Sequence, residues 1–206
     1  MALEIWLAFT FASLGLLAIP GPTVLIVVSY ALSRGRSSAW ATVPAVTLGD
    51  FTAITASLLG AGALLQTSAT LFTILKLAGA AYLIWLGIQS WRAKPLLEGL
   101  NNKYDTGVGR GRMFRNAYVV TALNPKSILF FVTFLPQFVD PERPALMQFV
   151  ILEATFLSLA TLNIILWALL AGEIRARWPA TLRYANRIGG GFLIAAGILS
   201  VTLRRA

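Results

Sequence analysis

Ile5–Leu32 reads IWLAFTFASLGLLAIPGPTVLIVVSYAL, an uncharged run that Pro20-Gly21-Pro22 interrupts near its middle. A helix of roughly 20 predominantly apolar residues is long enough to cross the hydrocarbon core of a bilayer. This run is therefore predicted to span a membrane. Each proline lacks a backbone N–H donor and clashes with the preceding turn, so the helix is predicted to break inside the span.

Five more apolar blocks follow the first. The 206 residues are 57% hydrophobic and 12% charged, with a mean hydropathy of +0.75, whereas soluble chains carry about 25% charged residues. The blocks predict six spans, approximately Ile5–Leu32, Ala39–Leu65, Leu71–Trp91, Met113–Val139, Ala145–Gly172 and Tyr184–Leu203. Because six spans use nearly the whole length, we expect an all-α integral membrane protein with a single transmembrane domain, residues 1–206.

Two chemically versatile residue types, cysteine and histidine, do not occur in the sequence. Disulfides, thiolate metal sites and Ser-His-Asp triads are therefore excluded, and the commonest metal ligand is missing. We expect no enzyme, no cofactor and no metal site. The net charge of +9 does not indicate a nucleic-acid partner, because the basic residues lie at the ends of the predicted spans, where lipid and topology explain them.

Lysine and arginine outside the spans are divided unevenly between the two sides of the predicted bundle. Twelve lie after the first, third and fifth spans, whereas three, Arg143, Arg204 and Arg205, lie on the other side. The positive-inside rule places the twelve in the cytoplasm and both termini outside. The one long connection, about residues 94–112, is then a cytoplasmic linker.

The linker separates two halves that resemble each other, repeat 1 over about residues 1–93 and repeat 2 over about residues 113–206. Lys76–Ser90 in the third span and Asn186–Ser200 in the sixth match without a gap at six of fifteen positions. Each half has an odd number of spans, so the second half enters the membrane from the opposite side. This pattern predicts two inverted three-helix repeats, an architecture typical of secondary transporters.

The break in the first span has a counterpart in the fourth. Asn124-Pro125-Lys126 interrupts that span at the position that Pro20-Gly21-Pro22 holds in the first. Paired broken helices leave free backbone groups beside a midplane cavity and are the best sequence pointer to a transporter's binding site. We expect these residues to form a helix break that gates the site, with a packing kink as the alternative.

Four ionisable residues lie inside the spans: Asp50, Lys76, Lys126 and Glu153. Such a residue costs at least ~2.5–3.5 kcal/mol at the bilayer centre and is expected to face the bundle interior. Asp50 and Lys126 lie at similar depth and form the predicted pair, with a structural ion pair as the alternative. Glu153 matches Asp50 in repeat 2, while Lys76 is close enough to the outer face to snorkel. Asn124 adds an amide to the site.

These motifs together resemble the lysine exporter (LysE/RhtB) family, from the first span to the sixth. The resemblance rests on Pro20-Gly21-Pro22, Gly49-Asp50, Lys76-x-x-Gly79-Ala80-x-Tyr82-Leu83 with Gly87, Asn124-Pro125-Lys126, Phe130-Phe131 and Pro136-Gln137-Phe138. It implies an exporter of amino acids such as threonine, homoserine, leucine or lysine in a bacterial inner membrane, driven by the proton gradient.

We therefore expect secondary-active export of a small amino acid or derivative by proton antiport and alternating access. A zwitterion would offer its ammonium to Asp50 and its carboxylate to Lys126 or to the helix end freed at Pro20–Pro22. The expected partners are the amino acid, protons and membrane lipid, with a homo-oligomer left open. The alternative is an exporter of ions, metals or other small metabolites from the same superfamily; a passive channel or a scaffold fits the inverted repeat less well.

Overall fold

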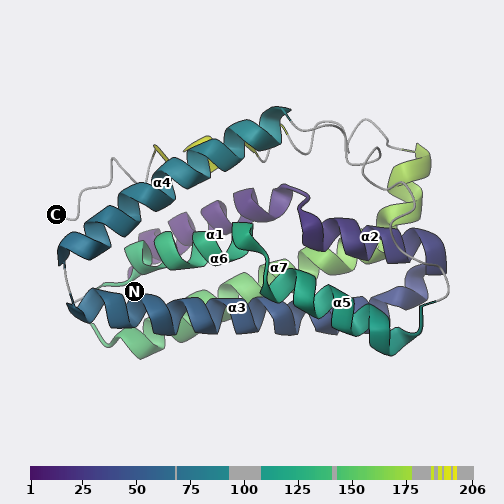
Figure 1. Cartoon of the computed structure of the whole chain (residues 1–206), viewed down its shortest axis with the longest axis horizontal. Coiled ribbons are helices and arrows are strands. Elements are labelled where there is room, and N and C mark those ends of the chain that lie inside the picture. The colour runs from purple at the N-terminus through teal and green to yellow at the C-terminus, as the bar shows by residue number, and fades with distance from the viewer. Residues whose placement is uncertain are drawn as a thin grey trace.

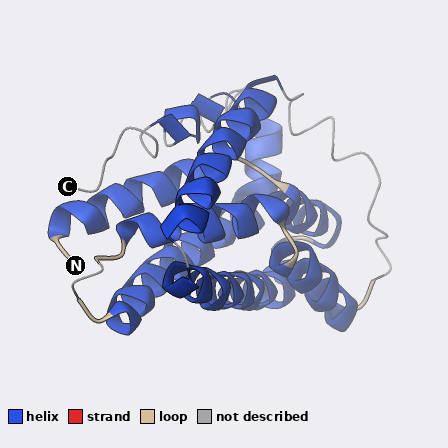
Figure 2. Cartoon of the chain, turned by 60° about the vertical axis from the view of Figure 1, so that its left-hand side comes forward, coloured by secondary structure: helices blue, strands red, loops and turns tan. Residues whose placement is uncertain are grey.

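The computed structural model describes residues 1–67, 69–92, 108–140 and 143–177, and in the C-terminal segment residues 187, 190, 191, 193–195, 197 and 198. The regular structure of these residues is helical, and they include no strand, as Figure 2 shows. The all-α class predicted from the sequence is confirmed.

The first apolar run forms two helices with a bend between them. α1 (Leu3–Ala18) ends before Pro20, and α2 (Pro22–Arg34) begins at Pro22, at an angle of 53° to α1. Pro22 takes the first helical position, where a missing N–H removes no intrahelical hydrogen bond. Gly21 precedes it as the N-cap in an extended conformation.

The second bent pair has the same construction. α5 (Arg110–Ala122) is followed by α6 (Pro125–Thr133) and the 3₁₀-helix η3 (Leu135–Phe138), with a bend of 41°. Pro125 again takes the first helical position, and the Asn124 side chain accepts a hydrogen bond from the backbone N–H of Lys126. The structure thus contains both breaks that the sequence predicts. α5 begins at Arg110, within the range expected for the linker.

The other described helices are unbroken: α3 (Ala39–Thr67), which follows the 3₁₀-helix η1 (Arg36–Ser38), α4 (Ala69–Arg92) and α7 (Ala145–Arg177). In the described part of the chain, two segments are long and apolar enough to cross a membrane, Arg36–Gly60 and Ala145–Glu173, and each bent pair counts as a further span if its two helices cross together. Of the other predicted spans, Leu71–Trp91 coincides with α4, and most of Tyr184–Leu203 lies outside the described residues.

The bent pairs cross the molecule in opposite directions, so their breaks lie side by side near its centre (Figure 1). α3 and α7 run the length of the molecule, also in opposite directions; of the bent pairs, α3 packs mainly along α5 and α6, and α7 mainly along α1 and α2. The breaks therefore meet inside a frame made by the two long helices.

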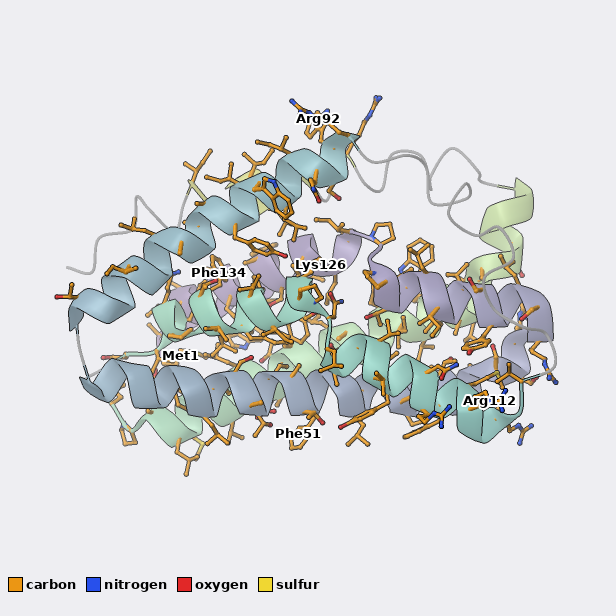
Figure 3. All side chains as sticks on the ribbon, in the orientation of Figure 1. Met1, Phe51, Arg92, Arg112, Lys126 and Phe134 are labelled. Carbon is orange, nitrogen blue, oxygen red and sulfur yellow. The ribbon has the colours of Figure 1, made fainter. Side chains whose placement is uncertain are left out.

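The hydrophobic core has two parts, one on each side of the breaks. The part around α1, α6 and η3 contains six buried or nearly buried phenylalanines, here called the aromatic cluster: Phe9, Phe130, Phe131, Phe134, Phe138 and Phe156. The part around α2 and α5 is built mainly from valine, isoleucine and alanine. Lys126 lies between the two parts, with Phe134 on one side and Arg112 at the far end of the other (Figure 3).

α4 packs against the C-terminal segment through small residues. A Cβ added to Gly87 would lie 2.6 Å from the Gly190 carbonyl oxygen, and one added to Gly197 would lie 2.8 Å from that of Ala80. Side chains at these positions would overlap with backbone, so the close approach depends on glycine. Small residues allow such approach between helices in a membrane.

α3 lies close against α5 at Gly49. A Cβ at this position would lie 2.8 Å from the Thr121 Cβ and 3.0 Å from the Tyr118 carbonyl oxygen. Asp50 follows Gly49 directly, so this contact fixes the position at which α3 presents its carboxylate.

Replacing Gly49 with alanine is expected to destabilise the protein by about 1–3 kcal/mol, the usual effect of inserting a methyl group into a filled space. Gly60→Ala is the matched control, because Gly60 lies on the same helix and a Cβ there meets open space. Thermal unfolding of the purified variants in detergent measures both changes. Equal unfolding midpoints would contradict the close contact of α3 with α5.

Candidate functional site

A small cavity lies where the two breaks meet. About 40 Å³ of it is accessible to water. A single water molecule needs about 10–15 Å³ of such space, so the cavity has room for roughly three. Its polar lining side chains are Thr23, Asp50, Asn124, Lys126, Ser127 and Asn163.

The Lys126 ammonium joins the second break to the first. Its Nζ donates hydrogen bonds to the carbonyl oxygens of Leu16, at 3.2 Å, and Ile19, at 2.9 Å. In an unbroken helix the N–H of residue 20 would bond to the Leu16 carbonyl, but proline has no N–H to give. Lys126 therefore supplies a donor that Pro20 lacks, and it places a positive charge at the C-terminal end of α1, where the helix dipole favours a cation.

Gly21 lies directly beside this ammonium. A Cβ on Gly21 would lie 3.4 Å from Lys126 Nζ and 3.5 Å from its Cε, at ordinary van der Waals contact. The first break is therefore packed against the Lys126 side chain.

A hydroxyl and amide network joins the breaks on the side of α2 and α5. The Thr121 hydroxyl and the Asn124 side-chain amide both donate to the Thr23 hydroxyl, each at 3.3 Å. Thr121 and Asn124 are buried, and Thr23 is half-buried. The start of α2 is therefore held to the end of α5 by polar side chains.

Asp50 on α3 supplies the negative charge of the cavity. Its side chain is nearly buried, with 6% of the residue exposed, and it interacts electrostatically with Lys126. The ion pairs among the described residues are Arg36–Glu173 and Asp140–Arg143, so Asp50 faces Lys126 without forming a direct ion pair with it. The carboxylate is available to a proton or to a cationic group that enters the cavity.

α7 contributes an apolar wall with one amide. Phe156, Ala160 and Asn163 line the cavity from this helix. The Phe156 ring lies edge-on to the Phe131 ring, with 4.7 Å between the ring centroids. Phe156 therefore belongs both to the cavity and to the aromatic cluster, which closes the cavity on the side of α1 and α6.

The structure brings together Asp50, Asn124 and Lys126, but it keeps Glu153 apart from them. Glu153 accepts a hydrogen bond of 2.7 Å from the Thr55 hydroxyl, between α7 and α3, and does not line the cavity. Lys76 lies in α4, and its side chain falls outside the described part of the structure.

The lining side chains that were not singled out from the sequence include Thr23, Ser127 and Phe156. Thr23 and Ser127 directly follow Pro22 and Lys126, so a hydroxyl residue next to a predicted break was the signal that could have found them. Phe156 carries no such signal, because phenylalanine is common in apolar spans.

The cavity presents the chemistry of a site for a small charged or zwitterionic molecule. It combines one carboxylate, one ammonium, an apolar wall, and the amides and hydroxyls of the two breaks. The described residues contain no group of three or more acidic, histidine or cysteine side chains placed to hold a metal ion.

Comparison with known proteins identifies relatives over nearly the whole chain. The sequence profile of the family described as LysE type translocator matches residues 14–203. A homoserine/homoserine lactone efflux protein of Salmonella typhi is 35% identical over 208 residues, covering all of both chains. A leucine efflux protein of Salmonella choleraesuis is 27% identical over 93% of this chain and 89% of its own. An uncharacterized membrane protein of Vibrio cholerae is 30% identical over 99% of this chain and 100% of its own. No solved structure matches the chain.

Asp50 and Lys126 are expected to be energetically coupled. Asp50→Asn and Lys126→Gln each leave one charge without its counterpart, so the double variant should be more stable than the sum of the single effects by about 0.5–3 kcal/mol. Denaturant unfolding in mixed micelles measures this coupling. Glu4→Gln, an exposed acid in the first turn of α1, replaces Asp50→Asn in the control cycle and should be additive with Lys126→Gln. Additivity in the Asp50 cycle would show that the two charges do not interact.

Proposed function

Because the chain belongs to the LysE type translocator family, we propose that it exports a small amino acid or amino-acid derivative across a bacterial inner membrane. The names of two relatives, homoserine/homoserine lactone efflux protein and leucine efflux protein, support amino-acid efflux as the activity. Proteins of one family thus carry substrates as different as a hydroxylated and a branched apolar amino acid. The particular substrate of this chain depends on its own cavity.

One observation carries the proposal: two broken helices meet at a cavity that holds a carboxylate and an ammonium. A zwitterionic amino acid complements both charges, with its ammonium on Asp50 and its carboxylate on Lys126. Asn124 is placed to bond the same carboxylate, and the wall at Phe156 and Ala160 faces the substrate side chain. Glu153, which Thr55 holds away from the cavity, is assigned the role of joining α3 to α7.

We propose that the chain consists of six spans in two inverted repeats, within one transmembrane domain. The contacts between α4 and the C-terminal segment support this symmetry. Adding 110 to the residue number converts Ala80, Ile84 and Gly87 into Gly190, Ile194 and Gly197. The same addition relates the contacts: a Cβ on Gly87 would meet the Gly190 oxygen and the Ile194 Cγ1, and a Cβ on Gly197 would meet the Ala80 oxygen and the Ile84 Cγ1. A two-fold axis between inverted halves generates this reciprocity.

The size of the cavity supports transport by alternating access. Room for roughly three water molecules is too little for an amino acid, whose smallest relevant examples have eight or so non-hydrogen atoms. The cavity must therefore open for the substrate to enter or leave. In carriers with inverted repeats, one half rocks against the other around the site.

Asp50 is the group that we propose to couple transport to protons. A buried carboxylic acid is favoured in its neutral form by the low dielectric, and a nearby cation favours the ionised form. The proton affinity of such a group changes whenever a cation approaches or withdraws. Movement of Lys126 or arrival of a substrate ammonium would therefore release or admit a proton, as antiport requires.

The proposed orientation follows the basic residues. Arg112 lies at the end of the molecule opposite Met1 (Figure 3), and Arg34 donates to the Val108 carbonyl oxygen at that same end. The positive-inside rule assigns this end to the cytoplasm and Met1 to the outside.

A carrier of uncharged or cationic amino-acid derivatives is the second candidate. One relative is named for a lactone as well as for homoserine, and a lactone has no carboxylate. Asp50 alone would then supply the charged contact.

Purified protein in liposomes loaded with labelled threonine, homoserine, leucine or lysine tests the proposal. An imposed pH gradient should accelerate release of one or a few of these compounds, and Asp50→Asn should reduce release to that of protein-free liposomes. Glu4→Gln, exposed on the first turn of α1, should release substrate like the wild type. Release that does not depend on the pH gradient, or an Asp50→Asn variant that retains coupling to it, would contradict proton antiport through Asp50. No release of any amino acid would contradict the proposed function itself.

A further inference from the structure

We propose that Lys126 is a tether that the substrate's carboxylate releases, so that binding of an amino acid frees the broken end of α1. The inference rests on the proposed function and specifies how the site changes shape when it is loaded. It also assigns the class of substrate that causes this change of conformation: compounds with a free carboxylate.

The base of the Lys126 side chain is fixed, while its tip reaches another helix. Lys126 is the second residue of α6, and its backbone N–H donates to the Asn124 side chain at 3.1 Å. The ammonium crosses to the last turn of α1, where it binds the Leu16 and Ile19 carbonyl oxygens. One side chain therefore ties the start of α6 to the end of α1.

This tie uses most of the ammonium's bonding capacity. A lysine ammonium has three N–H donors, and two of them serve α1. Lys126 also lines the cavity opposite Asp50, so a ligand there reaches the same ammonium. A bidentate acceptor in the cavity therefore competes with at least one carbonyl of α1.

A carboxylate is the acceptor that wins this competition. The ammonium makes charge-assisted bonds to either acceptor, but a carboxylate carries a full negative charge whereas a carbonyl at a helix end carries only a partial one, so the Coulomb attraction is stronger at the carboxylate. A carboxamide or a lactone offers just another neutral carbonyl oxygen. The ammonium is expected to give up its bonds to α1 when a carboxylate binds and to keep them when one of these neutral groups binds.

Release at this point would move one end of α1 more than the other. Near the start of the helix, the Trp6 indole N–H donates to the Thr155 hydroxyl at 3.0 Å. At its cavity end, the Leu16 carbonyl would keep only its 3.3 Å hydrogen bond from the Ile19 N–H, because Pro20 has no N–H to donate. α1 would therefore swing at the cavity while its first turns remain attached to α7.

The test uses two spin labels on a chain that has no cysteine of its own. Leu14→Cys on α1 and Val119→Cys on α5 place labels at exposed positions, 45% and 43% exposed, on opposite sides of the break. Pulsed electron–electron double resonance in liposomes measures the distance between the two labels. The measurement is made with each of four added compounds: L-homoserine, L-homoserine lactone, L-leucine and L-leucinamide. The transport assay on the same labelled protein shows which carboxylate probe is a substrate.

The transported carboxylate probe should shift the distance distribution, and its lactone or amide should not. The shift should disappear in Lys126→Gln and persist in the exposed control Glu4→Gln. Equal shifts with the carboxylate and its neutral analogue, a shift retained in Lys126→Gln, or no shift with a transported amino acid would each overturn the tether. The ligand comparison needs no lysine variant, so it decides the matter even if Lys126→Gln does not fold. Absence of amino-acid transport by the unlabelled wild-type protein would instead contradict the proposed function.

Discussion

The hydrogen bonds from the Lys126 ammonium to the Leu16 and Ile19 carbonyl oxygens hold the two broken helices together. A bilayer offers no water to backbone groups, so a helix that breaks inside it needs replacement partners from the protein. Pro20 creates the need on α1, and Lys126 meets it from α6. The second break therefore stabilises the first, which places the functional groups of both at one point.

The rest of the fold serves this meeting point. Gly49 lets α3 approach α5 closely enough to present Asp50 to the cavity, and the network of Thr23, Thr121 and Asn124 closes the other side of the breaks. The aromatic cluster fills the space between α1, α6 and α7. The cavity is thus bounded by stiff aromatic packing on one side and by hydroxyl and amide bonds on the other. The polar side offers bonds that can be exchanged, whereas opening the aromatic side requires several rings to separate.

Local chemistry made the breaks and the inward-facing charges predictable from the sequence. Proline lacks an N–H wherever it stands, and a charge inside a span is expected to face the protein; the structure has helix breaks at Pro20 and Pro125 and buries Asp50. The acceptors of Lys126 were not predictable, because they are backbone oxygens of a helix more than a hundred residues away. The repeat pointed to Glu153, but the polar side chain that α7 brings to the cavity is Asn163, ten residues further along the same helix. Sequence similarity between the halves locates equivalent helices and leaves open which helix face each one turns to the site.

The account depends on the two breaks lying in contact and separating during transport, and a cross-link measures both. The Thr23 and Thr121 hydroxyl oxygens are 3.3 Å apart, and a disulfide needs its sulfurs at about 2.05 Å, a small adjustment. In the cysteine-free background, oxidation of Thr23→Cys/Thr121→Cys in liposomes should form the disulfide and stop amino-acid release, and reduction should restore release. Oxidation should not change the release rate of either single-cysteine variant. Failure of the disulfide to form would contradict the contact between the breaks. Full transport with the disulfide intact would contradict the claim that the breaks must separate.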